Sequence, residues 1–591
     1  MQLVPRTISV ELDGEPVNVT TFAARPVGVS ALEVDAHLRD GGLAWAVVNR
    51  SDRPVRVRRV SVEMTVDGTA GPIRMWRNGY QSWSPCDTAI VGHHADPSTL
   101  SPTFESFHGV HHADQRLARD GEIRSEWVTV IADESNAIAL GAIGGSAHDV
   151  TFRARRDDAT VALSIEAFLG GAVLEPGERR TLHDVRFDGA GQATAADAPE
   201  LLGAWAAAAG EAEGARTSAP YQVGWCSWYH YFGDITAADI ATNLALAGEW
   251  PFDVFQVDDG YQRAIGDWLE TNEKFPEGLG RLARDIGDRG FRPGIWLAPF
   301  LAAPDSQVAR DHPDWFARHT NGRPLVAWLN PSWGGGQGGL MWALDTTHPE
   351  VLAHLEGVGR DLAALGFTYV KLDFTFAPSL DGGWHDEHRT PAERVRAGYD
   401  AVRRGVGDDT FLLGCGVPLG HVVGVVDGNR IGPDVAPEWA LPADREVIAG
   451  YLRAQPATAH ALSNTLARSF MHRRLWLNDP DCLMLRTDST ELSPAAARSW
   501  AEVVAISGGM ALVSDDLALL GPDAESMLDD VLGTGRRSDD RARDGQPARC
   551  NDLMTGELPT TLSSGRIAIG VDFESGSAVR ERREGQRIAE K

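Results

Sequence analysis

The sequence predicts a multidomain α/β and β protein, in which a central (β/α)8 TIM barrel lies between an N-terminal β-sandwich and a small C-terminal β-domain. Its 591 residues exceed the size of one ordinary domain. Short apolar–polar alternations dominate the first part of the chain and are typical of antiparallel strands. Further on, strand-like and helix-like runs alternate about eight times, as in a barrel of parallel strands. We therefore expect domains at 1–195, 196–516 and 517–591.

The N-terminal region is predicted to be a large antiparallel sandwich. Its alternating runs are TISVEL, AWAVV, VRVRRVSVEM, EWVTVI and ATVALSIEAF, and turns rich in Gly, Asp and Asn separate them. The Ala-rich stretch TAADAPELLGAWAAAAGEAEGA that follows predicts a helix linking this region to the next.

The barrel prediction depends on strands that end in polar residues and are followed by helices. The strand candidates are VGWCSW, DVFQVDDG, RPGIWLAPF, TYVKLDF, FLLGCG, GNRIGPD, RLWLNDPD and MALVSDD. A doubly wound open sheet is the alternative, but it usually has fewer strands, and the GGGQGG segment lacks the GK[ST] of a phosphate-binding loop. After about Asp516 we expect a charged, irregular segment and then strand again at GRIAIGVDF.

Composition narrows the function classes. Lys plus Arg total 55 and Asp plus Glu total 83, so the formal charge is −28, which disfavours nucleic acid and anionic membranes as partners. Five scattered cysteines without a CxxC pair fit a reducing compartment. We find no signal-peptide pattern and no apolar run long enough to cross a bilayer, and therefore expect a cytoplasmic protein.

Polar residues at the C-terminal ends of the predicted barrel strands mark the candidate site, because barrel enzymes carry their active sites there. Aromatic faces stack on sugar rings, and carboxylates accept hydrogen bonds from hydroxyls, so aromatic and acidic residues together predict a carbohydrate site. The strand ends offer Trp225 to Tyr229, Asp258, Asp259, Trp296, Lys371, Asp373, Cys415, Arg430, Asp434, Asp479, Asp481, Asp515 and Asp516.

The motif VKLDF places Lys371 and Asp373 two residues apart on a strand, so their side chains point the same way. A lysine keeps a neighbouring aspartate ionised, and an ionised carboxylate on a rigid strand suits a glycosidase nucleophile. A structural ion pair inside the barrel is the alternative. The chain has only three lysines (Lys274, Lys371 and Lys591) among 55 basic residues, so a compact ammonium at this position is a weak further hint.

The motif RIGPD places Arg430 and Asp434 four residues apart at a strand end, where Gly432 and Pro433 force a bend. Asp434 could donate a proton if burial or nearby carboxylates raise its pKa. A turn aspartate that bonds its own backbone is the alternative. Asp258 and Asp259 in VDDG could bind sugar hydroxyls, although DDG is also a common turn pattern.

Other candidates are weaker. The histidines His93, His94, His108, His111 and His112 lack a settled metal-ligand spacing, and we interpret them as loop residues. The serines Ser227 and Ser507 lack the G-x-S-x-G pattern of a serine hydrolase.

Taken together and in order, GWCSWYHYF, FQVDDGY, PGIWLAPF, KLDF, GCG, RIGPD and WLNDPDC resemble glycoside hydrolase family 36, most closely its bacterial α-galactosidases. The segment NGYQSWSPC resembles the part of that family's N-terminal domain that reaches the active site. The resemblance runs from about Asn78 to Asp516 and implies an N-terminal β-supersandwich, a catalytic barrel and a C-terminal β-domain. GPD at the RIGPD motif, where larger tetrameric members have SDN, indicates the compact bacterial type and leaves open a monomer or a small homo-oligomer.

The resemblance also implies a role for each matched residue. Asp373 would be the nucleophile and Asp434 the general acid/base. Asp258, Asp259 and Lys371 would bind galactosyl hydroxyls, and Cys415 and Arg430 would lie near the 2-hydroxyl. The pocket walls would be Tyr229, Trp296 and, from the neighbouring domain, Trp83.

The resulting hypothesis is a retaining α-galactosidase that acts on melibiose- or raffinose-type oligosaccharides without a metal or cofactor. A related α-galactosyl transferase and an α-N-acetylgalactosaminidase are alternatives on the same fold. From other classes, two further alternatives are a metal-dependent hydrolase using Asp258, Asp259, Asp479 and Asp481, and a sugar-binding protein without activity.

Overall fold

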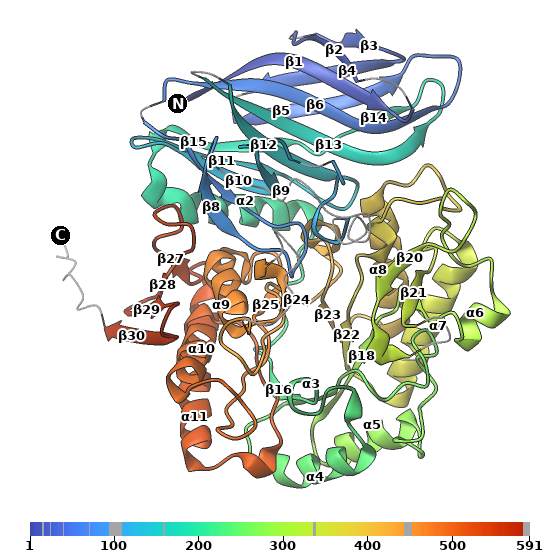
Figure 1. Ribbon diagram of the computed structural model, residues 1–591, viewed down its shortest axis with the longest axis vertical. Helices are drawn as coiled ribbons and strands as arrows, with labels where there is room; N and C mark the ends of the chain where they lie inside the picture. The colour runs from blue at the N-terminus through green and yellow to red at the C-terminus, as the bar shows by residue number, and fades with distance from the viewer. Residues whose placement is uncertain are drawn as a thin grey trace.

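A computed structural model describes residues 1–582, apart from 15–16, 24, 40, 70, 94–108, 117, 158–159, 335–337 and 443–451. A β-sandwich lies against one end of a barrel of parallel strands, and a small β-sheet lies at the side of the barrel (Figure 1). The fold class predicted from the sequence is thus confirmed. The domain boundaries stay predictions.

The N-terminal sandwich consists of two antiparallel sheets whose inward side chains alternate with outward ones. In β4 (Leu32–Arg39), for example, every second residue from Leu32 to Ala36 is buried, as expected of a strand with one face on the core. One sheet contains β1 (Gln2–Leu12), β2 (Asn18–Thr21), β6 (Val55–Asp67), β9 (Ile123–Glu126), β12 (Asp149–Asp157) and β13 (Thr160–Leu174). The other contains β3 (Val27–Val29), β4, β5 (Gly42–Asn49), β7 (Arg74–Arg77), β8 (Asp87–Ile90), β10 (Val128–Ala132), β11 (Ala137–Ala142), β14 (Arg179–Thr181) and β15 (Val185–Ala193).

The predicted linking helix is α2 (Ala198–Glu213). Pro199 stands in its first turn, where no intrahelical partner for an N–H is needed, and Gly214 ends it with a φ of 67°. The helix buries Trp205 against the sandwich, where the indole donates to the carbonyl of Ala142. The helix therefore joins the two regions as packed structure.

All eight predicted barrel strands are present, and they pair in parallel in the order β25-β24-β23-β22-β18-β17-β16-β26. A hydrogen bond of 3.0 Å from the Met510 amide to the Asn478 carbonyl joins the two ends of the sheet, so the barrel closes. The strands are short and buried on both faces, which explains their uninterrupted apolar runs. They are β16 (Val223–Cys226), β17 (Val254–Val257), β18 (Arg292–Leu297), β22 (Tyr369–Leu372), β23 (Phe411–Gly414), β24 (Gly428–Arg430), β25 (Leu477–Asp479) and β26 (Ala511–Val513).

Helices surround the barrel, and their ends carry the expected signals. Thr390 and Glu393 form a capping box at the start of α8, and Gly366 ends α7 in the left-handed region. The connection from β23 to β24 carries a single turn of 3-10 helix (Leu419–Val422) where the regular pattern would have a helix. The helices are α3 (Trp228–Tyr231), α4 (Ala237–Ala247), α5 (Leu279–Asp288), α6 (Gln307–Asp311), α7 (Pro349–Leu365), α8 (Pro391–Val406), α9 (Thr458–Ala467) and α10 (Pro494–Ser507).

The expectation of an irregular segment after Asp516 is wrong, because helix α11 (Pro522–Arg543) occupies most of it and packs against α10. Its buried residues Ala524, Leu528, Val531 and Leu532 follow helical spacing, but the charged residues between them hid this pattern. Strands β27 (Arg549–Cys550), β28 (Thr561–Ser564), β29 (Ile567–Asp572) and β30 (Ser577–Arg582) follow as one antiparallel sheet.

A three-stranded antiparallel sheet that the sequence did not predict is inserted between β18 and α7. It consists of β19 (Leu301–Ala302), β20 (Val326–Leu329) and β21 (Leu340–Ala343), and β20 and β21 lie on the right of the barrel in Figure 1. This insertion sheet follows β18 directly, so it lies at the end of the barrel where the strands terminate.

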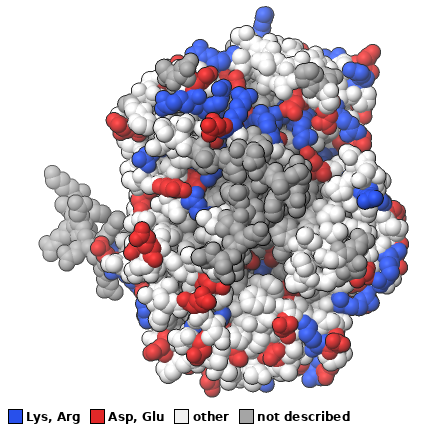
Figure 2. Space-filling view, in the orientation of Figure 1, with Lys and Arg blue, Asp and Glu red and all other residues white. Residues whose placement is uncertain are grey.

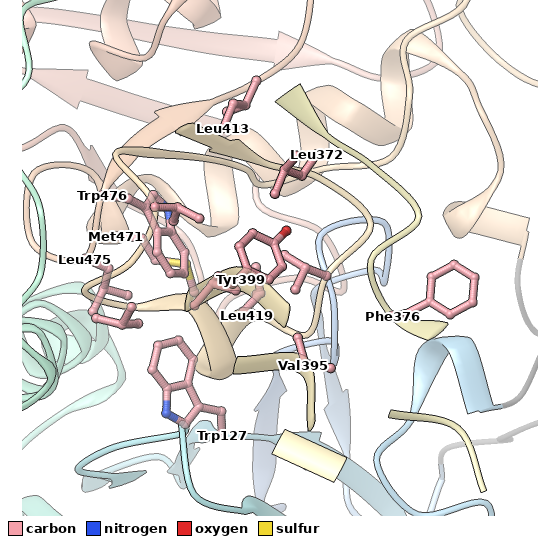
Figure 3. Close-up of a cluster of buried hydrophobic side chains, with 14 of the residues drawn as sticks. Trp127, Leu372, Phe376, Val395, Tyr399, Leu413, Leu419, Met471, Leu475 and Trp476 are labelled. Atoms are coloured by element: carbon pink, nitrogen blue, oxygen red, sulfur yellow. The ribbon is translucent and has the colours of Figure 1, made fainter. Parts of the chain in front are cut away.

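The sandwich and the barrel share one continuous hydrophobic core. Figure 3 shows Trp127 of the sandwich among barrel side chains that include Met471, Leu475 and Trp476. The rings of Trp127 and Trp476 are stacked with centroids 6.5 Å apart. This packing holds the sandwich on the barrel in one orientation.

A buried arginine at the end of α9 joins the two regions by hydrogen bonds. Arg468 donates to the carbonyls of Gly79 (3.0 Å) and Ser82 (2.8 Å) in the sandwich, and to that of Ile431 (2.7 Å) in the barrel. Asn464, one turn earlier, accepts from the Cys86 amide at 3.0 Å. The segment Asn78–Cys86 is thus fixed against the barrel beside β24.

Charged side chains of both signs cover the face seen in Figure 2, and basic ones are frequent over the sandwich at the top. Within the described ranges, no helix combines the length and the apolar character needed to cross a lipid bilayer.

Candidate active site

Asp373 lies immediately after β22, where its side chain is held by three neighbours. The Trp296 indole donates to Oδ2 at 3.1 Å and the Phe374 amide donates to Oδ1 at 2.8 Å. The ammonium of Lys371 is 3.8 Å from Oδ2. Phe374 has a φ of 52°, a conformation that costs energy for a residue with a side chain and is typical of functional sites. This carboxylate therefore has two hydrogen-bond donors and a cation beside it.

Lys371 joins Asp373 to Asp258, the first carboxylate after β17. Its Nζ donates to Asp258 Oδ2 at 3.0 Å, and Gln256 donates to the same oxygen at 2.5 Å. Burial lowers the pKa of Lys371, but Asp258 and Asp373 outweigh it and raise that pKa well above its usual value. The ammonium is therefore charged, and the VKLDF residues point together as predicted.

Asp259 points toward the insertion sheet. Its carboxylate accepts from Gln262 (2.6 Å) and from the indole of Trp333 (2.6 Å). Burial raises its pKa, and the charges of Asp258 and Asp373 raise it further. Sequence reasoning missed Trp333, which lies in the PSWGGGQGG segment, because no strand or helix pattern marks that loop as part of the barrel mouth.

Asp434 lies after β24, and the surroundings of its carboxylate differ from those of Asp373. Its Oδ1 accepts from Arg430 at 2.8 Å, and about a third of its side chain (32%) stays exposed. Partial burial in the barrel mouth raises its pKa; Arg430 opposes this, and the negative charge of Asp373 raises the pKa further.

Arg430 is fully buried and holds two further carboxylates from the β25 end. It lies 3.2 Å from Asp479 and contacts Asp481 through both terminal nitrogens at 2.8 Å. The hydroxyl of Tyr229 also donates to Asp481. Tyr229 is itself almost fully buried.

Cys415 follows β23 and is fully buried, and burial raises the pKa of its thiol well above the usual value. The next residue, Gly416, has a φ of 55° and donates its amide to Ser82 Oγ of the sandwich at 2.9 Å. A Cβ on Gly416 would lie 2.8 Å from the Trp83 ring, so only glycine lets the two approach. Trp83 therefore lies beside the end of β23, at the barrel mouth.

Aromatic side chains surround Phe374, the residue after Asp373. Ring centroids of Trp83, Trp328 and Trp333 lie 5.1, 5.4 and 4.9 Å from that of Phe374. They come from the sandwich and the insertion sheet, and all four side chains are partly exposed. We call Trp83, Trp328, Trp333 and Phe374 the aromatic rim.

Several strand-end residues do not join this group. Asp515 is buried and bonded to Arg486 at 2.6 Å, and Asp516 caps the turn that follows it. His111 is buried and bonded to Ser84, and His94 and His108 lie outside the described residues.

The carboxylates of the metal-dependent alternative are divided between two cations. Asp258 is bonded to Lys371, whereas Asp479 and Asp481 are bonded to Arg430. Among the described residues there is no group of three or more His, Cys, Asp or Glu side chains arranged to hold a metal ion. Because these carboxylates are bonded to different protein groups and do not converge on one point, the arrangement does not favour a metal-dependent hydrolase.

Comparison with known proteins shows which class of protein this chain resembles. Residues 223–377, from β16 to just beyond Asp373, match the family model described as Melibiase. The barrel fold and this match together make the chain similar to the barrel glycoside hydrolases. Within that class it is similar to the α-galactosidases of glycoside hydrolase family 36, and the resemblance predicted from its motifs is confirmed.

Curated relatives match over a limited part of their length. The chain is 28% identical over 155 residues to α-galactosidase AgaA of Geobacillus stearothermophilus, which covers 25% of this chain and 20% of the relative. It is 29% identical over 178 residues to an A type blood α-D-galactosamine galactosaminidase of Flavonifractor plautii, covering 27% and 16%. The first curated relatives are thus matched over a fifth of their length or less.

Solved structures match over most of the chain. The α-galactosidase TtGalA of Thermus thermophilus, in complex with stachyose, is 28% identical with a TM-score of 0.66, and the match covers 86% of this chain and 98% of that one. The same protein in complex with p-nitrophenyl α-D-galactopyranoside is 27% identical, again with a TM-score of 0.66, and the match covers 85% of this chain and 92% of that one. Similarity to AgaA at 15% identity and a TM-score of 0.58 supports the fold alone.

Proposed function

We propose that the protein is a retaining α-galactosidase that hydrolyses terminal α-linked galactose from oligosaccharides of the melibiose and raffinose type. The contrast between the two carboxylates carries this proposal. Asp373 has two donors and a lysine nearby, which suits a nucleophile that must be ionised. Asp434 has a raised pKa and partial exposure, which suits a group that donates a proton to a leaving group and later accepts one from water.

In the proposed mechanism, Asp373 attacks the anomeric carbon while Asp434 protonates the departing glycosidic oxygen. The bond from the sugar to the leaving group breaks, and a β-galactosyl ester with Asp373 forms. Asp434, now ionised, takes a proton from water, and that water attacks the anomeric carbon and releases α-galactose and the free carboxylate. Lys371, Asp258 and Asp259 would bind galactosyl hydroxyls.

The partner implied is a neutral galactoside, and this agrees with a barrel mouth in which the charged groups are largely paired with one another. TtGalA, to which the chain is similar, is described in complexes with stachyose and a nitrophenyl α-galactoside, and this supports the same substrate class here. The cytoplasmic location and the oligomeric state stay predictions from the sequence.

The replacement Asp373→Ala tests the assignment. It should lower kcat/KM for p-nitrophenyl α-galactoside by at least about 10⁴-fold, because the covalent step has lost its nucleophile. Added azide should restore part of the activity by occupying the vacated space. The first product of the unmodified enzyme, followed by NMR, should be α-galactose.

A panel of nitrophenyl α-glycosides separates the alternatives. Galactose should be preferred over glucose and N-acetylgalactosamine; a preference for the N-acetyl sugar would favour the galactosaminidase alternative. Near-normal turnover by the Asp373→Ala variant, or β-galactose as the first product, would contradict the proposed mechanism.

A further inference from the structure

Asp481 makes more contacts than an ordinary structural aspartate would need. Its side chain is fully buried, and its backbone has a φ of 98°, which is rare for a residue with a side chain. Such strain persists only where the surroundings enforce it, and it concentrates at functional sites. The motif WLNDPDC marked this segment in the sequence, but the proposed mechanism gives Asp481 no role.

Both oxygens of Asp481 are saturated with donors. Oδ1 lies 2.8 Å from Arg430 Nη2 and accepts the Cys482 amide at 2.7 Å. Oδ2 accepts Arg430 Nη1 at 2.8 Å, the Val435 amide at 2.9 Å and the hydroxyl of Tyr229. All of these groups donate, so they stabilise the ionised form of the carboxylate.

Two of these contacts lead directly to Asp434. Arg430 Nη1 is shared, because it donates to Asp481 and also to Asp434 Oδ1 at 2.8 Å. The Val435 amide belongs to the residue that follows Asp434, so Asp481 also fixes the local backbone. Asp481 therefore holds both the side-chain partner and the main chain of Asp434.

The negative charge around Asp434 and Asp481 favours the binding of one proton by the pair. Asp434, Asp479 and Asp481 are three carboxylates on the single guanidinium of Arg430. Burial raises the pKa of Asp481 and of Asp434, and the negative charge of Asp434 raises the pKa of Asp481 further. Asp434 accepts fewer hydrogen bonds than Asp481, so its ionised form is less stabilised by donors than that of Asp481. The other charged or titratable groups acting on the pair are Lys371, Asp373, Cys415, Cys482 and Tyr229.

We propose that Asp481 is the positioning residue of the acid/base: it fixes Arg430 and the Val435 amide, and its negative charge keeps the shared proton on Asp434. The inference rests on the proposed function, because it assigns a task to Asp481 only if Asp434 protonates a leaving group. In this arrangement Arg430 bonds to both Asp434 and Asp481, in addition to any contact with substrate.

The test is the pH dependence of kcat/KM for Asp481→Asn. Removing the negative charge stabilises ionised Asp434, so its pKa falls and the acid loses its proton at a lower pH. The alkaline limb of the profile should move down by about one pH unit. The limb set by the nucleophile should stay in place.

Leaving groups provide a second readout. With weaker acid catalysis, kcat/KM should fall further for phenyl galactosides with poor leaving groups than for the p-nitrophenyl substrate, so its dependence on leaving-group pKa should steepen. A merely structural role would lower kcat/KM evenly across the series and leave both pH limbs unmoved, and that result would overturn the proposal.

Two further variants serve as controls for misfolding and for effects that are not specific to Asp481. Asp515→Asn removes a similarly buried aspartate that is paired with Arg486 and accepts the Leu485 amide, and it should not move the alkaline limb. Tyr229→Phe keeps every charge but removes one donor from Asp481, and it should move the limb in the same direction by a smaller amount. If Asp481→Asn does not fold, an unmoved limb in Tyr229→Phe overturns the proposal. Absence of α-galactosidase activity in the unmodified protein would instead contradict the proposed function.

Discussion

At the scale of single residues, the two described lysines differ sharply in their surroundings. Lys371 is buried and bonded to Asp258, with Asp373 at 3.8 Å. Lys274 is partly exposed and donates to the carbonyl of Gly233 in a loop. Rarity of lysine pointed equally to both positions. Only the three-dimensional surroundings show that one ammonium lies between carboxylates and the other holds a loop.

The replacement Lys371→Arg should lower kcat/KM by about 100-fold or more, because a planar guanidinium is larger and would displace Asp258 or Asp373. The measurement is steady-state kinetics with p-nitrophenyl α-galactoside. Lys274→Arg is the matched control and should stay within about threefold of the unmodified enzyme, since an arginine can donate to the same carbonyl. Similar losses in both variants would show that the compact ammonium is not needed at the site.

The sequence predicted many of the site residues because they follow barrel strands. Asp258, Asp373, Cys415 and Arg430 all stand within one residue of a strand end, where parallel strands bring side chains to one rim. Trp333 could not be found in this way, because it lies in a loop whose position depends on a distant packing partner. The role of Asp481 was also hidden, since the same motif residue suits a metal ligand or an ion pair.

At the scale of elements, the insertion sheet supplies half of the aromatic rim. Trp328 comes from β20 and Trp333 from the turn after it, and both pack on Phe374 beside Asp373. Neighbouring Leu329 is 58% exposed, so this edge of the sheet faces solvent. A sugar leaving group departing from the site would meet this edge, because partly exposed indole faces stack on pyranose rings.

The replacement Trp328→Ala tests that role. It should lower kcat/KM for raffinose about tenfold, because a stacking surface worth about 1 kcal/mol or more is lost. The value for α-galactosyl fluoride, whose leaving group is a single atom, should change little. Trp342→Ala is the matched control: this partly exposed tryptophan lies in β21 and packs on Phe316, outside the rim. Equal losses for both substrates would contradict the role.

The order of strands and helices was predictable to a large extent, and the exceptions have physical reasons. Buried parallel strands appear in the sequence as apolar runs, so all eight were visible. Helix α11 was missed because its apolar positions are separated by charged residues and interrupted by Gly533 and Gly535. The insertion sheet was missed because its strands are two to four residues long and lack a clear alternation.

At the scale of the whole molecule, Arg468 connects the sandwich to the barrel at the site itself. Its guanidinium is fully buried, and the carbonyls that it satisfies lie in the Trp83 segment and next to Arg430. A buried carbonyl that loses its donor stays out of water without a hydrogen bond, and this destabilises the folded state. Arg468 therefore contributes to holding Trp83 in the barrel mouth, together with the bond between Gly416 and Ser82.

The replacement Arg468→Met should lower the free energy of unfolding by about 3 kcal/mol or more, since several buried acceptors lose their donor. It should also raise KM, because the Trp83 segment would no longer be fixed. Urea denaturation and steady-state kinetics measure the two effects. Arg474→Met, on the same side of the barrel but half-buried and bonded to the Phe470 carbonyl, should change stability much less and leave KM unaltered. A normal KM in Arg468→Met would show that the segment keeps its place without the arginine.

The reach of Trp83 into the barrel mouth has a consequence for biogenesis. The groups that meet there span the chain from Trp83 to Asp481, and the sheet closes only when β26 arrives. A ribosome adds residues in order, so the sandwich can fold early. Trp83 can pack at the barrel mouth only after the barrel strands have been translated, hundreds of residues later. Contacts so distant in sequence form slowly. The complete barrel mouth is therefore the last part of the molecule to form, and a truncated product should lack the proposed activity.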